Sequence, residues 1–158
     1  MQHPNYQELT DLQRKALDVA EEVLKNSYNP YSNFFVGAAL FAEEGTIVSG
    51  TNFENAAYGS TICAERSATL RANAMGLRRF SGIAIIARGI NFDTTEVTGP
   101  CGSCRQVLYE LAQLSGTAFE VVLSTTKKDK IIIATIKELL PLGFGPLDLG
   151  IDIAKYQK

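Results

Sequence analysis

Three cysteines are the residues of this sequence whose type and spacing could do chemistry. Cys101 and Cys104 lie three positions apart, and Cys63 precedes them. On a helix that starts at Cys101, both thiols project from one face of the first turn, where the helix N-terminus stabilises negative charge. A structural zinc site has four protein ligands, whereas a catalytic site keeps one position open for water. Since the only histidine, His3, lies at the chain terminus, three thiolates predict a catalytic zinc ion.

Charged residues follow two of these cysteines closely. Glu65 lies two residues after Cys63, and a carboxylate beside zinc-bound water can take its proton and pass it to a substrate nitrogen. A zinc ion with three thiolates is formally anionic, and we expect Arg66 and Arg105 to withdraw charge from the sulfurs. The alternative interpretation is ordinary helix chemistry: solvated arginines, and a glutamate paired with Arg66 or Arg71.

The Cys101–Cys104 pair also has the spacing of a redox dithiol. Taken alone, this motif does not distinguish disulfide chemistry from metal binding. Together with Cys63-Ala64-Glu65, the pair favours zinc, because a dithiol needs neither a third thiol nor a neighbouring carboxylate.

Helical and strand patterns alternate along the chain. Apolar residues recur at helical spacing early in the sequence, and Gly82–Ala87 is a continuous apolar run typical of a strand covered on both faces. We expect helices over residues 6–27, 63–75, 101–114 and 135–140, with Thr61 as the N-cap of the second, and strands over residues 34–42, 46–50, 82–87, 119–124 and 130–134. This order predicts an α/β fold in one domain over residues 1–158, with helices on both faces of a sheet.

Composition and charge exclude several classes of function. The formal net charge is −2 and the basic residues are scattered, so nothing indicates a groove for nucleic acid or a surface for anionic lipid. The sequence has no apolar stretch long enough to span a bilayer and no signal-peptide pattern at its start. The odd number of cysteines argues against a disulfide framework, and we expect a cytoplasmic protein.

Two motifs carry a resemblance to a known family. Cys63-Ala64-Glu65 and Pro100-Cys101-Gly102-Ser103-Cys104 match the signature of zinc nucleoside deaminases. Further matching segments are Pro30–Phe34, Val36–Leu40, Asn52–Tyr58, Glu138–Pro141, Phe144–Pro146 and Asp148–Leu149. The sequence resembles the small, three-cysteine cytidine deaminases from about residue 10 to residue 150. The tail from Gly150 to Lys158 has no motif that matches.

The resemblance implies a fold, a reaction and a set of site residues. The fold would be a three-layer α-β-α sandwich with a mixed sheet of about five strands. The activity would be zinc-dependent hydrolytic deamination of cytidine and 2′-deoxycytidine in pyrimidine salvage, with Glu65 catalytic and Cys63, Cys101 and Cys104 holding one zinc ion per subunit. The substrate-binding positions would be Phe34, Asn52, Glu54, Ala56, Tyr58, Ala64 and Phe144, with Ala56, Tyr58 and Phe144 reaching the ligand of a neighbouring subunit in a homotetramer.

Each substrate-binding position also has an ordinary structural interpretation. Asn52 and Glu54 have suitable donors and acceptors for a ribose hydroxyl, but asparagine after a strand often serves a turn. Phe34 could lie against the pyrimidine or simply belong to the core. Three other functions remain open: deamination of another cytosine nucleoside such as blasticidin S, editing of a polynucleotide, and a zinc-binding structural module without catalysis.

Overall fold

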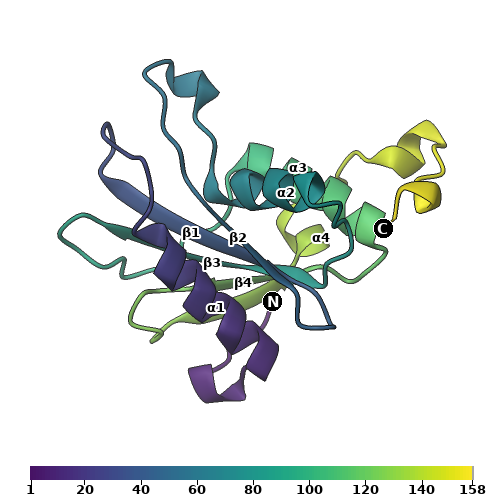
Figure 1. Ribbon diagram of the computed structural model, residues 1–158. Helices are drawn as coiled ribbons and strands as arrows, with labels where there is room; N and C mark the ends of the chain where they lie inside the picture. The colour runs from purple at the N-terminus through teal and green to yellow at the C-terminus, as the bar shows by residue number, and fades with distance from the viewer. Residues whose placement is uncertain (158) are drawn as a thin grey trace.

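The computed structural model describes residues 1–157, and its centre is a five-stranded sheet (Figure 1). The strands are β1 (Phe34–Phe41), β2 (Ile47–Thr51), β3 (Gly82–Gly89), β4 (Glu120–Ser124) and β5 (Ile131–Thr135). The α-helices are α1 (Asp11–Leu24), α2 (Ala64–Ala74), α3 (Gly102–Ser115) and α4 (Ile136–Leu139). Short 3-10 turns cover Tyr6–Glu8, Tyr58–Ser60, Pro146–Leu149 and Ala154–Tyr156. The expected α/β class with a mixed sheet is confirmed.

The sheet has the order β2-β1-β3-β4-β5. The β3–β4 pair is parallel and every other pair is antiparallel. A parallel pair requires a crossover connection, and α3 supplies it by leading from β3 to β4. Because β3 lies at the centre of the sheet, the loop after its carboxyl end delivers Cys101 to the start of α3.

Helix α1 covers one face of the sheet, as Figure 1 shows. Its N-cap is Thr10, whose hydroxyl accepts a hydrogen bond from the Gln13 amide while the Gln13 side chain accepts from the Thr10 amide. The buried side of the helix, which includes Ala16 and Leu17, packs against alternate sheet residues such as Ala39. The expected helix over residues 6–27 is therefore shorter, because a separate 3-10 turn precedes the cap.

Helices α2, α3 and α4 cover the opposite face (Figure 1). The core on this side joins Ala68 of α2 and Leu108 of α3 with the neighbouring sheet residues Ala38 and Leu40. Successive residues of β1 thus point to opposite layers, which is the period of a strand covered on both faces. Residues 1–157 include no helix with the length and apolar character needed to cross a membrane.

Helix α2 approaches the sheet closely because glycine stands opposite it. A Cβ at Gly50 of β2 would lie 2.3 Å from the Ala68 nitrogen and 2.7 Å from the Ala64 carbonyl oxygen. Both atoms belong to the backbone of α2 and cannot rotate away. Because Gly50 has no side chain, α2 can pack directly against β2. This glycine therefore sets the distance between the sheet and α2, the helix that begins immediately after Cys63.

Candidate metal centre and active site

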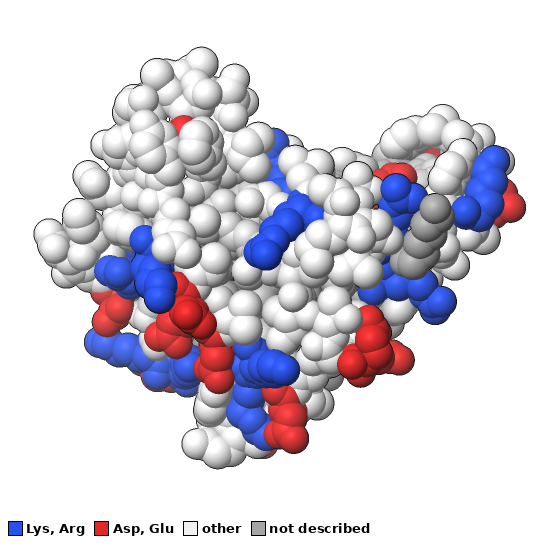
Figure 2. Space-filling model, viewed as in Figure 1, with Lys and Arg blue, Asp and Glu red and all other residues white. Residues whose placement is uncertain are grey.

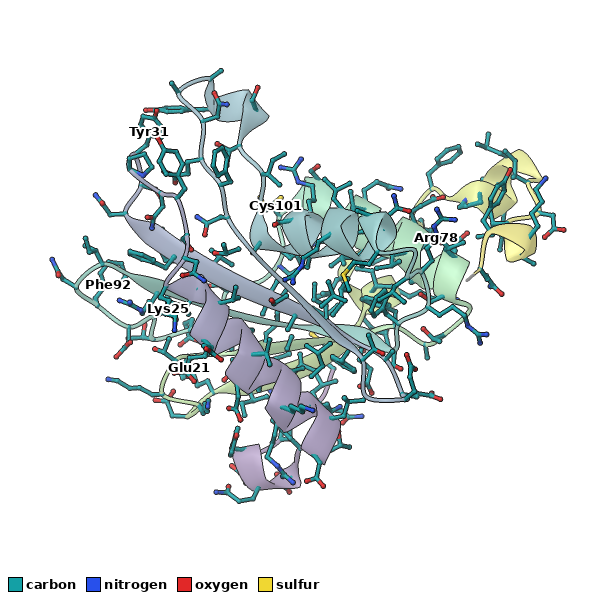
Figure 3. All side chains as sticks on the ribbon, in the orientation of Figure 1. Glu21, Lys25, Tyr31, Arg78, Phe92 and Cys101 are labelled. Atoms are coloured by element: carbon teal, nitrogen blue, oxygen red, sulfur yellow. The ribbon has the colours of Figure 1, made fainter. Side chains whose placement is uncertain are left out.

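The three cysteines converge at the first turns of two helices. Cys63 is the N-cap residue of α2 and Cys101 is the N-cap residue of α3. The Sγ atoms of Cys101 and Cys104 are 3.4 Å apart, and those of Cys63 and Cys101 are 4.0 Å apart. All three sulfur atoms lie within 4.8 Å of one another. Figure 3 shows Cys101 where α2 and α3 begin, so one ion can reach all three thiols.

Both N-cap cysteines leave their sulfurs free for this site. Neither side chain makes a capping hydrogen bond with its own helix. The expected N-cap Thr61 is wrong for α2, because the helix begins at Ala64 and Cys63 occupies the cap position. The Thr61 hydroxyl instead accepts a hydrogen bond from the Asn55 amide at 3.2 Å. The cap thus presents a metal-ligand atom where most helices present an oxygen.

The thiols polarise one another strongly. Hydrogen bonds from Cys104, Arg66 and Cys101 lower the pKa of Cys63 below that of an ordinary thiol, although burial opposes the shift. The pKa of Cys104 is raised because its hydrogen bond to Cys63 and its burial both favour the protonated form. Without a metal, thiols this close together cannot all lose their protons, because the thiolates would repel one another. A divalent cation bound between them stabilises all three thiolates at once.

Arg66 is the positive group of the site. Its Nη2 donates to the Thr61 carbonyl at 2.7 Å and lies 3.8 Å from Cys63 Sγ. Its Nε is buried and has no hydrogen-bond partner within residues 1–157. A buried guanidinium nitrogen beside thiols suits a site whose sulfurs carry negative charge, so the residues present fit a zinc–thiolate centre.

Arg105 is placed differently from what we expected. Its Nε donates to the Pro100 carbonyl at 2.9 Å and its Nη1 donates to the Leu139 carbonyl at 3.0 Å. These two hydrogen bonds therefore go to backbone oxygens of the loop before α3 and of α4 rather than to sulfur. Arg105 joins the loop before Cys101 to the end of α4.

Glu65 lies in the first turn of α2 and is only 5% exposed. Burial, together with the negative charge of Cys63, raises the pKa of its carboxyl group to about 6. The neighbouring Cys104 thiol and the positive charge of Arg66 oppose part of this rise in pKa. A carboxyl group with a pKa near neutrality can both accept and return a proton, which is the property required of a general acid–base catalyst.

The segment from Phe34 and the end of β2 form a second group of expected site residues. The side-chain amide of Asn52 accepts a hydrogen bond from the Val36 amide at 3.0 Å and donates to the Phe34 carbonyl at 2.9 Å. Asn52 therefore extends the β1–β2 pairing with its side chain, and its second N–H forms no hydrogen bond within residues 1–157. This bond fixes Phe34 and Asn52 next to each other.

Glu54 is held by a three-donor clamp. Its carboxylate accepts from the Tyr31 amide at 2.9 Å, from the Ser32 amide at 3.2 Å and from the Ser32 hydroxyl. Burial alone would raise the pKa of Glu54, but these hydrogen bonds outweigh it and hold the pKa below its usual range. A fixed carboxylate with a lowered pKa is a suitable acceptor for a sugar hydroxyl.

The remaining expected contacts are exposed in this chain. The side chain of Tyr58 is 74% exposed, that of Phe144 is 58% exposed, and Ala56 also faces solvent. Ala64, by contrast, is buried, and its amide lies at the start of α2 beside the thiols. Among the expected residues, these three are thus exposed, whereas Asn52, Glu54, Ala64 and Glu65 are buried.

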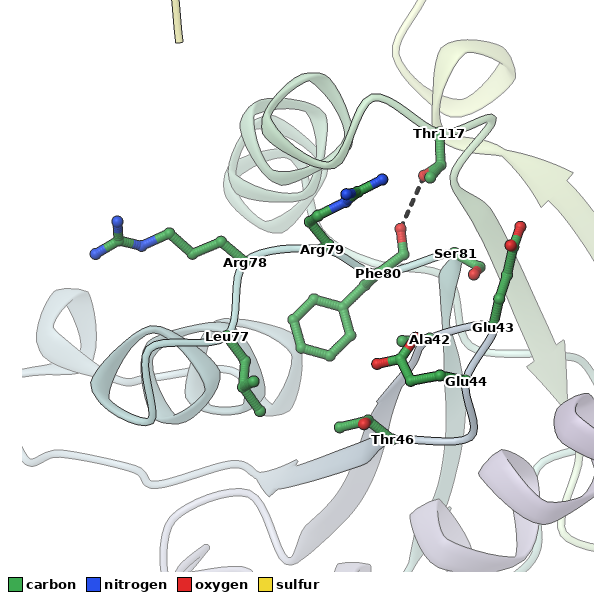
Figure 4. A pocket seen from close by; sticks show the side chains of 10 residues that line it. All are labelled: Ala42, Glu43, Glu44, Thr46, Leu77, Arg78, Arg79, Phe80, Ser81 and Thr117. Atoms are coloured by element: carbon green, nitrogen blue, oxygen red, sulfur yellow. Dashed lines mark hydrogen bonds between the residues drawn. The ribbon is translucent and has the colours of Figure 1, made fainter. Parts of the chain in front are cut away.

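A separate hollow of about 540 Å³ lies beyond the other end of α2 (Figure 4). It is lined in part by Glu43, Glu44, Arg78 and Arg79, and it includes none of the cysteines. Leu77, which follows the C-terminal end of α2, is one of its walls. Since Cys63 caps the opposite end of the same helix, this hollow is not part of the candidate site.

Comparisons with known proteins agree with this geometry. Residues 10–119 match the family model described as the cytidine and deoxycytidylate deaminase zinc-binding region. The chain belongs to this deaminase family. A cytidine deaminase of Sporosarcina psychrophila is 42% identical over 136 residues, which are 86% of this chain and 93% of that protein. A cytidine deaminase of Halalkalibacterium halodurans is 41% identical over 83% of this chain and 92% of that protein.

Solved structures of deaminases share the fold. The crystal structure of cytidine deaminase from Burkholderia pseudomallei has a TM-score of 0.74 and 38% identity, and the match covers 86% of this chain and all of that chain. The enzyme from Mycobacterium tuberculosis has a TM-score of 0.65 and 31% identity, with 81% of this chain and 93% of that chain covered. The deaminase family, the zinc-binding region and the three-thiol cluster all point to one zinc ion in this chain.

Two residues of the deaminase site were not anticipated in these roles. Ser32 fixes Glu54, and the Thr61 carbonyl holds Arg66. Ser32 lies within a matching segment, so the resemblance marks its position without indicating its partner. The Thr61 contact involves a backbone oxygen, for which the sequence carries no signal.

Proposed function

We propose that this protein is a zinc-dependent cytidine deaminase that converts cytidine and 2′-deoxycytidine to uridine and 2′-deoxyuridine with release of ammonia. The observation that carries the proposal is the buried carboxyl group of Glu65, with a pKa of about 6, beside three convergent thiols. A purely structural zinc site has a fourth protein ligand and no need for such a group.

Cys63, Cys101 and Cys104 would hold the metal, which supplies a Lewis acid that makes a water molecule nucleophilic at neutral pH. Glu65 accepts the proton that this water loses as its oxygen bonds to C4 of cytosine. The same carboxyl group then delivers the proton to N3. The hydroxyl group now on C4 then gives up its proton, which passes through Glu65 to the exocyclic amine. The C4–N bond breaks, C4 becomes the carbonyl carbon of uridine, and ammonia leaves. Arg66 offsets the charge of the thiolates throughout.

The residues around β1 would bind the nucleoside. The free N–H of Asn52 and the fixed carboxylate of Glu54 suit the 3′-hydroxyl of a ribose. The Ala64 amide would donate to cytosine O2, and Phe34 would lie against the base or sugar. Because Asn52 and Glu54 suit the hydroxyl group of an unmodified ribose, we favour cytidine over blasticidin S as the substrate. A role in pyrimidine salvage follows from that substrate.

Subunits would share these sites in a homotetramer. Many of the exposed large apolar side chains lie in two stretches of the sequence, 28–58 and 142–156, and contiguous exposed apolar surface is typical of contacts between chains. In Figure 2 the segment that carries Tyr58 rises as a mostly uncharged projection, and a hollow separates it from the C-terminal lobe. Ala56 and Tyr58 would reach the ribose of one neighbour, and Phe144 the base of another. The reduced cysteines support a cytoplasmic location.

The decisive experiment follows the absorbance of cytidine with purified protein whose zinc content has been measured. We expect conversion to uridine by the wild type, and a loss of about 10²- to 10⁴-fold in kcat for Glu65→Gln at unchanged zinc content. Turnover at the wild-type rate by zinc-loaded Glu65→Gln would contradict the role of Glu65. Bound zinc with no change in cytidine, deoxycytidine or blasticidin S would favour the structural module.

A further inference from the structure

Helix α3 holds the chain segment that presents Phe144. The Gln106 side-chain amide donates to the Phe144 carbonyl at 2.7 Å, and Arg105 donates to the Leu139 carbonyl at 3.0 Å. Both donors directly follow Cys104, the buried thiol of the metal centre. One turn of α3 therefore carries both the metal ligand Cys104 and the two side chains, Arg105 and Gln106, that bind the backbone of the segment from Leu139 to Phe144.

The segment continues along α3 beyond these two bonds. A Cβ at Gly143 would lie 2.9 Å from the ring of Tyr109, and a Cβ at Gly145 would lie 2.6 Å from the side-chain amide of Gln113. Positions 106, 109 and 113 repeat at the spacing of one helix face. The backbone from Leu139 to Gly145 thus follows α3 closely, with glycines where the approach is tightest.

The exposure of Phe144 contrasts with the restraint of its backbone. The Gly145 amide donates to Asp148 at 2.8 Å, and the following Pro146 is buried. The segment is fixed on both sides of Phe144, yet the ring is 58% exposed. A large apolar side chain that is held in place and turned outward is suited to a contact with another molecule.

We propose that Gln106 and Arg105 are positioning residues, which place Phe144 for contact with the substrate base bound in a neighbouring subunit. This inference rests on the proposed deaminase function with shared sites. It assigns Arg105 a role different from charge compensation at sulfur: its two bonds tie the loop before Cys101 to the end of α4. The geometry of one subunit's metal centre is thereby linked to the neighbour's substrate contact.

Gln106→Glu tests the proposal with little change in shape. The carboxylate cannot donate to the Phe144 carbonyl and repels it, so the ring loses its fixed position. We expect KM for cytidine to rise about tenfold, the effect of one lost hydrogen bond, while kcat changes by less than about threefold. Zinc content should match the wild type, because the change leaves all three thiols in place, and the lost hydrogen bond should lower the free energy of unfolding by only about 1 kcal/mol. Gln7→Glu, the same change at another exposed glutamine, is the matched control and should leave KM unaltered.

Two further measurements separate positioning from a general structural effect. Phe144→Ala should raise KM comparably, and Gln106→Glu should add nothing in the double variant, because both act through the same ring. Additive effects would overturn the proposal. An unchanged KM in Gln106→Glu would also overturn it.

Mixed tetramers test whether the contact crosses subunits. Glu65→Gln subunits are inactive but carry an intact Gln106, so mixing them with Gln106→Glu subunits supplies correctly placed Phe144 rings to sites that retain Glu65. We expect KM in the mixed tetramers to return toward the wild-type value. A KM that stays raised would overturn the action between subunits. Failure of the proposed function has a different result, since wild-type protein would then not convert cytidine at all.

Discussion

Gly50→Ala should displace helix α2, which carries the proposed catalytic residue Glu65, without altering that side chain. The new Cβ would lie 2.3 Å from the Ala68 nitrogen, whereas ordinary contact begins at 3.4 Å. Helix α2 or strand β2 must therefore move by 3.4 − 2.3 = 1.1 Å, because backbone atoms cannot rotate out of the way. Since Cys63 caps α2 and Glu65 lies in its first turn, both would shift with the helix.

The displacement sets the expected magnitudes. A misplacement of about 1 Å at a reacting centre costs about 10²-fold in rate, and overpacking of a core costs about 1–3 kcal/mol of stability. We expect kcat for cytidine to fall by about 10²-fold in the zinc-loaded Gly50→Ala enzyme. The assays are cytidine absorbance, metal analysis and urea denaturation.

Two other glycine substitutions serve as controls. A Cβ at Gly37 would lie 1.8 Å from the Ala20 carbonyl oxygen of α1, on the opposite face of the sheet. Gly37→Ala should therefore lose stability while its folded fraction keeps a nearly normal kcat. Gly59→Ala places the methyl group in open space and should leave the free energy of unfolding unchanged. A wild-type kcat in Gly50→Ala, or equal losses of kcat in Gly50→Ala and Gly37→Ala, would refute the reasoning.

Two further predictions concern the thiols and the ribose side. Removal of zinc by a chelator should abolish turnover and make up to three thiols per chain reactive toward a thiol reagent. The exposed Cys101 should react before the buried Cys104. An unchanged number of reactive thiols would contradict metal binding by the cysteines. Glu54 has a lowered pKa in the folded state, so its stabilisation is present above its ordinary value of 4.5 and is lost as the pH falls through the folded value. The stability advantage of wild type over Glu54→Gln, measured by urea denaturation, should shrink between pH 6 and pH 3, and a constant difference would be inconsistent with this linkage.

The first turns of the two site helices could be predicted well from the sequence. The spacing of Cys101 and Cys104 places both thiols on one helical face, and Glu65 follows Cys63 within the same turn. These relations depend only on local helix geometry. The side chains of β1 alternate between the cores on the two faces of the sheet, and this too depends only on local geometry, because neighbouring residues of a strand point to opposite faces.

Contacts between distant segments depended on the tertiary structure. Arg66 and Arg105 both follow a metal ligand closely in the sequence, but only Arg66 lies within reach of a sulfur atom. The sequence pattern does not distinguish the two arginines, because a long side chain turns toward whichever carbonyl or thiol the neighbouring helices and strands bring near. The hydrogen bond from Ser32 to Glu54 was not predicted for the same reason.

The types and local spacing of the chemical groups were thus determined by the sequence, and their relative placement was decided by the fold. Three thiols, one carboxylate and their positions on two helix termini follow from the order of residues. That Cys63 meets Cys101, and that the chain after α4 returns to α3 and turns Phe144 outward, follows from a sheet that places α2, α3 and α4 on one face. Local geometry is encoded within a few residues, whereas packing depends on the whole chain at once.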